Sequence, residues 1–94
     1  MRDTTEVPVS PTWYEGRVIL DLPPVAGKRK RRVVKVVVDA GEEAGNEFWV
    51  HHDDIPEWLR KGMFVTFWLV WTETPHPGTT ERVRVATNIF PQRT

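Results

Sequence analysis

The sequence contains no cysteine among its 94 residues. Disulfide bonds and zinc sites with thiolate ligands are therefore excluded, which fits the reducing cytoplasm. The longest strongly apolar run, residues 63–71, is much shorter than the ~20 residues that cross a bilayer. The first residues lack the charged-then-apolar pattern of a signal peptide. We therefore expect a soluble, cytoplasmic protein that does not enter a membrane.

The chain also lacks net charge, because 13 Lys and Arg residues balance 13 Asp and Glu residues. The two signs are nevertheless separated along the sequence. Six cations fall within residues 28–35, whereas residues 36–59 contain no Lys or Arg. A folded domain with this distribution can steer a polyanion to one of its sides although its net charge is zero.

Most of the remaining pattern is typical of β-strands. Residues 1–12 are polar and we interpret them as a flexible leader before a single domain over residues 13–91. Alternation and β-branched runs predict five strands, over residues 14–22, 33–38, 48–52, 64–71 and 82–86, the last continued by 88–90. Prolines and a glycine predict a loop over residues 74–80.

A short helical turn is expected between the third and fourth strands. Asp54 suits a cap, Pro56 a first turn and Gly62 a stop. An all-β chain with five strands and this turn fits the small closed Greek-key barrel of the OB-fold, although the pattern alone leaves an SH3-like barrel open.

Four segments of the chain resemble the cold-shock domain family. Gly16-x-Val18 is similar to the start of the family's first strand, and residues 48–55, Phe-Trp-Val-His-His-Asp-Asp-Ile, are similar to its third. Leu59-x-x-Gly62-x-x-Val65-x-Phe67 matches the fourth segment, and residues 86–89 resemble the closing strand. The similarity spans about residues 15–90 and implies an OB-fold that binds single-stranded nucleic acid.

The chain departs from the family in its first two strands. The family has Trp-Phe on the binding face where this chain has Ile19, Leu20 and Asp21, and its aromatic and glycine-rich second strand is replaced by residues 33–38, which contain no aromatic residue. The first RNA-binding motif is thus degenerate. Of the family's stacking surface, Trp49, His51 and His52 carry over.

The expected site combines these stacking residues with a basic segment. Alternation places Trp49 and His51 on the outer face of the third strand, where they can stack bases. Phosphate contacts would come from the one–two connection and from flanking cations. These are Lys28, Arg29, Lys30, Arg31, Arg32, Lys35 and Arg17, with Arg82 and Arg84 extending the surface.

Two other chemistries are not expected. Neighbouring strand residues point in opposite directions, so only His51 with Asp53, or His52 with Asp54, would share a metal, and a third ligand is missing. A nucleophile and oxyanion donors are missing too, so we expect neither an enzyme nor a cofactor.

The alternative hypothesis is a protein-binding OB module, an adapter or regulator within a nucleic-acid machine. Its outer face, with Val33, Val37 and Ile19, would dock a protein partner or a second copy in a homodimer. The five tryptophans add a further surface. Trp58 and Trp71 suit the core, whereas Trp68 and Phe64 are either an interface or a face covered by Trp13 and Tyr14.

Overall fold

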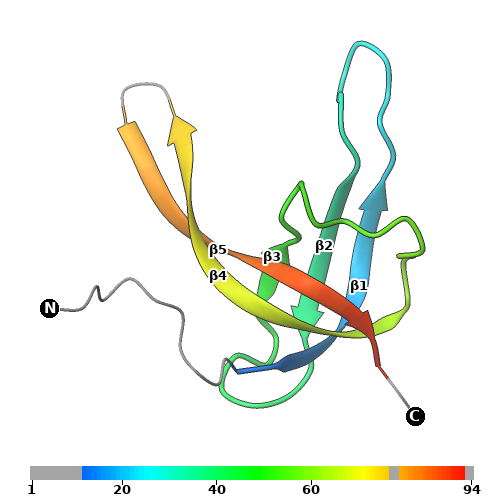
Figure 1. The fold of residues 1–94 in the computed structure, drawn as a ribbon, viewed down its shortest axis with the longest axis vertical. Coiled ribbons are helices and arrows are strands. Elements are labelled where there is room, and N and C mark those ends of the chain that lie inside the picture. The colour runs from blue at the N-terminus through cyan, green and yellow to red at the C-terminus, as the bar shows by residue number, and fades with distance from the viewer. Residues whose placement is uncertain (1–11, 77–78, 93–94) are drawn as a thin grey trace, which may run out of the picture.

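The computed structural model describes residues 12–76 and 79–92, which form one antiparallel five-stranded sheet (Figure 1). The predicted all-β class and the number of strands are confirmed, and residues 1–11 of the predicted leader lie outside the described residues. The strand order is β3-β2-β1-β4-β5. The strands are β1 (Tyr14–Leu22), β2 (Val33–Val38), β3 (Glu47–Trp49), β4 (Phe64–His76) and β5 (Thr79–Pro91).

The sheet is open, and the predicted closed barrel is wrong in this respect. Its edge strands β3 and β5 approach each other where Val50 forms a parallel bridge to Ala86. There the His51 amide donates to the Ala86 carbonyl oxygen at 2.8 Å. The chain turns directly after this point, so β3 is too short to build a longer ladder with β5.

The core lies on one face of the curled sheet, and it is built mostly from valines. On β2, alternation buries Val34, Val36 and Val38 and leaves the residues between them half-buried. Val65 and Phe67 of β4 are fully buried opposite them. Bulges between Val18 and Leu20 of β1 and between Thr66 and Trp68 of β4 break the alternation and bend both strands.

Gly16 lies within β1, two residues before the buried Val18, at a position where the neighbouring strands leave no room for a side chain. A Cβ at this position would collide with the carbonyl oxygen of Val37 on the neighbouring strand and would lie 3.2 Å from the Phe67 ring. Only glycine lets β1 lie this close to both neighbours.

Residues 54–62 do not form the predicted helical turn, and no helix occurs in the described part of the chain. Two isolated turns replace it, closed by the amides of Leu59 and Met63 bonding to the carbonyls three residues earlier, both at 3.2 Å. The end of this segment pairs instead with β1, because Val18 exchanges backbone bonds with Gly62 and Met63 at 2.8 and 2.9 Å. Leu59 is fully buried as the cover of the core, whereas Trp58, which was expected there, is 41% exposed.

The last two strands extend beyond the rest of the sheet as a two-stranded arm (Figure 1). Beyond Phe67, β4 pairs with β5 alone, and the register continues to His76 opposite Thr79. The predicted loop over 74–80 is thus mostly strand; Pro75 is tolerated because β4 has a neighbour on one side only. Trp71 lies on this arm and is 58% exposed, so its predicted place in the core is wrong.

No helix of the described residues is long and apolar enough to span a membrane.

Candidate functional site

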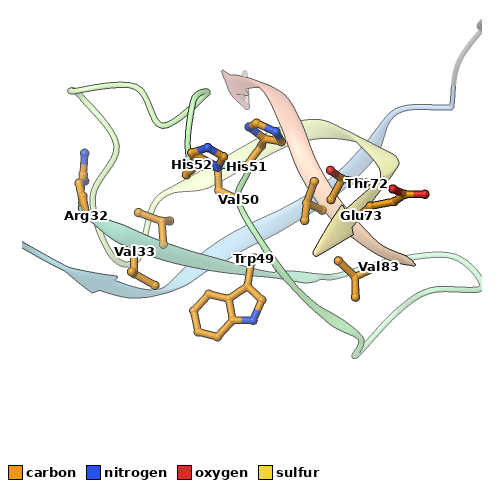
Figure 2. A pocket seen from close by; sticks show the side chains of 11 residues that line it. Arg32, Val33, Trp49, Val50, His51, His52, Thr72, Glu73 and Val83 are labelled. Carbon is orange, nitrogen blue, oxygen red and sulfur yellow. The ribbon is translucent and has the colours of Figure 1, made fainter. Parts of the chain in front are cut away.

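A groove of about 580 Å³ lies between the β4–β5 arm and the β2–β3 side of the sheet (Figure 2). Its apolar lining consists of valines from β2, from β5 and from the residue that follows β3. These valines are Val33, Val34, Val50, Val83 and Val85. The polar and aromatic side chains around them are Arg32, Trp49, His51, His52, Thr72 and Glu73.

Trp49 is the last residue of β3, and its side chain is available to a ligand. The residue is 47% exposed and lies opposite Lys35 in the β2–β3 register. The Lys35 ammonium is 4.3 Å from the centroid of the indole ring and 3.5 Å from a carboxylate oxygen of Glu47. An aromatic ligand on Trp49 would therefore be held beside a cation, which is a favourable place for a nucleotide.

The two histidines are not arranged as the alternation predicted. β3 ends at Trp49, so His51 and His52 belong to a turn that the Asp54 amide closes onto the His51 carbonyl oxygen at 2.9 Å. The imidazoles therefore stack on each other instead of pointing to opposite faces, with ring centroids 4.6 Å apart at 17°. In the view of Figure 2, both rings lie together on one side of Val50 and the Trp49 indole lies on the other side.

The basic segment forms the connection between β1 and β2, which projects beyond the sheet (Figure 1). Val25 and Arg29 pair across it, and Arg29 Nε donates to the Pro23 carbonyl oxygen at 3.1 Å. Lys28, Lys30 and Arg31 are exposed. We call residues 28–31 the basic tip.

Arg32, the last cation of the run, is bound inside the protein. Its guanidinium donates to both carboxylate oxygens of Asp21, at 2.8 and 3.0 Å, and to the carbonyl oxygens of Pro56, at 2.9 Å, and Leu59. The hydrogen bond from Arg32 holds the pKa of Asp21 below its ordinary value, and the bond to Asp21 raises the pKa of Arg32. Arg32 thus joins the base of the basic segment to the loop that covers the core.

Three further predicted cations, Arg17, Arg31 and Arg84, have acidic partners, and Arg82 has an aromatic one. Arg17 on β1 lies 3.6 Å from Asp39 and does not line the groove, whereas Arg31 lies 3.8 Å from Asp53 beside the groove. Arg84 forms two bonds to Glu43, at 2.9 and 3.0 Å, which lower the pKa of the Glu43 carboxyl. Arg82 lies with its guanidinium carbon 5.1 Å from the Trp71 ring centroid.

The residues of the β4–β5 arm are the part of the groove that sequence reasoning missed. Thr72, Val83 and Val85 line it, yet residues 74–80 read as a loop and so concealed the arm. The alternation of valines with arginines over residues 82–85 predicts the central part of β5, which carries Val83 and Val85, but not the extension of β4 that pairs with it. Val33 was expected on a docking face and instead lines the groove.

A separate aromatic patch lies where residue 13 packs on the arm strands. Trp13 contacts Trp68 and Phe90 edge to face, with centroid distances of 5.1 and 5.7 Å. Trp13 and Phe90 remain 46% and 53% exposed, and Phe64 on β4 is 52% exposed. Trp13 therefore covers Trp68, which is one of the two predicted alternatives, whereas Tyr14 turns inward and stacks on the core residue Phe67.

Comparisons of the chain with protein-family models, with curated proteins and with solved structures give no match.

Proposed function

We propose that this protein is a non-enzymatic binding protein for single-stranded RNA or DNA, a divergent relative of the cold-shock domains that acts in the cytoplasm. The strand order β3-β2-β1-β4-β5, with a parallel contact between β3 and β5, supports an OB-type arrangement, which is a partly open five-stranded Greek-key barrel. In that fold the β2–β3 face and the β1–β2 and β4–β5 connections bind oligonucleotides.

The observation that carries the proposal is the half-exposed Trp49 beside an apolar groove at the corresponding place. Stacking a base on an aromatic side chain contributes about 1–3 kcal/mol and needs no particular base. The valines Val33, Val50 and Val83 would contact the faces of the base, which are largely apolar. Lys35 beside the indole would then meet the phosphate backbone.

The experiment that tests the proposal is a titration with an unstructured 12-nucleotide strand at low salt, followed by tryptophan fluorescence. We expect quenching that saturates, because a base on Trp49 changes the surroundings of its indole. An unchanged spectrum and an unchanged anisotropy of a labelled strand would contradict the proposal.

The basic tip is expected to supply the salt-dependent part of the affinity. Replacing Lys28, Lys30 and Arg31 together by Ala should reduce the slope of log affinity against log salt concentration by about 2 in magnitude. Each phosphate contact to a single strand contributes about 0.7 to this slope. Filter binding at four salt concentrations measures this slope. Lys61→Ala removes an exposed cation outside the groove and should leave the slope unchanged. An equal slope in the triple variant would show that the tip does not contact phosphate.

A second candidate function, a protein interface, is favoured by the aromatic patch of Trp13, Trp68 and Phe90. Large exposed aromatic side chains are enriched at the anchors of protein interfaces. If two copies pair through this patch, light scattering should show a mass that doubles with concentration, and Trp13→Ser should return it to the monomer. A monomer at all concentrations would exclude the homodimer.

A further inference from the structure

The turn after β3 gathers three side chains that ligate transition metals. His51, His52 and Asp53 each offer one ligand atom, and these three atoms lie within 4.8 Å of one another. Imidazole and carboxylate are common ligands of Zn²⁺, Ni²⁺ and Cu²⁺, whereas Mg²⁺ and Ca²⁺ require oxygen donors.

The structure brings His51 and His52 together, although strand alternation predicts that they point apart. Strand alternation would send His51 and His52 to opposite faces, but β3 ends at Trp49 and the chain turns. The two rings consequently stack 4.6 Å apart, and Nε2 of His52 lies 3.4 Å from Oδ1 of Asp53. The turn thus supplies the third ligand that an extended strand could not.

The backbone holds this turn in place independently of its three side chains. The His51 amide donates to Ala86 of β5 at 2.8 Å, and the Asp54 amide closes the turn at 2.9 Å. The Asp54 carboxylate is in turn bonded by the hydroxyl of Thr87, which is buried. Because both ends of the turn are fixed, little backbone conformational entropy is lost when the side chains close on an ion.

The ring of His51 is also oriented. Its Nδ1 accepts a hydrogen bond from the Asp53 amide at 3.1 Å, so this nitrogen carries a lone pair that is directed into the turn. This hydrogen bond fixes the orientation of the imidazole within the turn.

We propose that His51, His52 and Asp53 form a binding site for one divalent transition-metal ion of the Zn²⁺, Ni²⁺ or Cu²⁺ type, with water in the remaining coordination positions. The proposal does not depend on the groove binding nucleic acid. Arg31, whose guanidinium is 3.8 Å from Asp53, opposes the ion by like charge and competes for the same carboxylate.

The test is calorimetric titration of the full, untagged chain with Zn²⁺, with Ni²⁺ as a second probe. We expect one ion per chain and a melting temperature that rises with metal concentration, because the ion binds the folded state. His51→Ala and His52→Ala should each weaken binding by at least about tenfold, as is usual when a metal site loses a supporting group. Arg31→Ala should strengthen it.

The chain offers a matched control in His76, its third histidine, which belongs to β4. His76→Ala should leave the affinity unchanged, and the absence of cysteine removes thiolates as competing ligands. The melting temperatures of the variants without metal separate a lost ligand from a lost fold. The proposal is overturned if wild type takes up no zinc, if binding follows His76, or if the His51 and His52 variants, folded as wild type, bind zinc equally well.

Discussion

Trp49→Ala should weaken the binding of a single-stranded oligonucleotide by about 5- to 150-fold, the equivalent of the ~1–3 kcal/mol that one stacked base contributes. The loss is expected because Trp49 is the exposed aromatic residue among those that line the groove. Fluorescence anisotropy of a labelled strand measures the affinity without relying on the indole that is removed. The stability of the variant should change little, since the side chain is already half exposed.

A second tryptophan provides the control for this prediction. Trp58 is similarly exposed, at 41%, but it belongs to the 54–62 loop and does not line the groove. Trp58→Ala should therefore bind as wild type does, and Trp49→Phe, which retains an aromatic face, should recover part of the affinity. If Trp49→Ala and Trp58→Ala bind equally well, base stacking on β3 is not how this protein holds a ligand.

The largest expected effect on stability comes from Arg32. Arg32→Met keeps most of the length of the side chain but removes four hydrogen bonds, and it leaves the Asp21 carboxylate and two loop carbonyls without their partner. Both charged side chains are about four-fifths buried. We expect a loss of about 2–4 kcal/mol in the free energy of unfolding, because breaking a largely buried pair leaves an uncompensated charge. Urea denaturation measures it.

Arg32→Met should also change how the free energy of unfolding depends on pH. The bond from Arg32 lowers the pKa of Asp21 in the folded state, so the ionised carboxylate contributes stability above its unfolded pKa of about 3.9. This contribution is lost as the pH falls through the lowered, folded pKa. The gap between wild type and Arg32→Met should thus be largest near neutral pH and should narrow below about pH 4.

Arg31 is the matched control, because it is the adjacent residue and carries the same charge. Its pair with Asp53 is 3.8 Å long and both side chains are mostly exposed. Arg31→Met should therefore cost no more than about 1 kcal/mol. Equal losses in the two variants would mean that the Arg32 bonds do not fasten the loop to the sheet.

The parts of the fold that the sequence predicted are those that depend on local signals. β1 and β2 have the predicted bounds, since Pro23-Pro24 ends the first and the β-branched residues 33–38 define the second. The strand predicted over residues 64–71 was also found, as part of β4, and Trp13 packs on Trp68 of this strand.

The errors arise where partners distant in the sequence decide the conformation. Residues 54–62 have the signals of a helix start and stop, but backbone bonds from Val18 to Gly62 and Met63 hold the segment against β1. The β4–β5 arm was missed because prolines in residues 74–80 indicate a loop, although an edge position tolerates them. Local sequence propensity indicates neither the pairing of this loop with β1 nor the edge position of the arm.

Of the residues that the sequence proposed for the site, Arg32, Trp49, His51 and His52 line the groove, and their geometry differs from the prediction. Trp49 and Lys35 lie beside the groove, and Lys28, Lys30 and Arg31 are exposed on the tip. Arg32 is indistinguishable from its neighbours in sequence, yet it is bound to Asp21, which lies 11 residues earlier. The sequence predicts that the histidines belong to the third strand. In the structure β3 ends at Trp49, and the next two residues, Val50 and His51, contact Ala86 of β5 instead.

The central claim is that the groove beside Trp49 receives the bases of a single-stranded oligonucleotide, while the basic tip contacts its phosphates. Two-dimensional NMR of the labelled protein tests it directly, because the five tryptophans each give one indole N–H signal. We expect a 12-nucleotide strand to shift the indole signal of Trp49 and the amide signals of Val33, Val50 and Val83, while the indole signals of Trp13 and Trp68 stay in place. Shifts confined to Trp13 and Trp68, or a spectrum unchanged by the oligonucleotide, would contradict it.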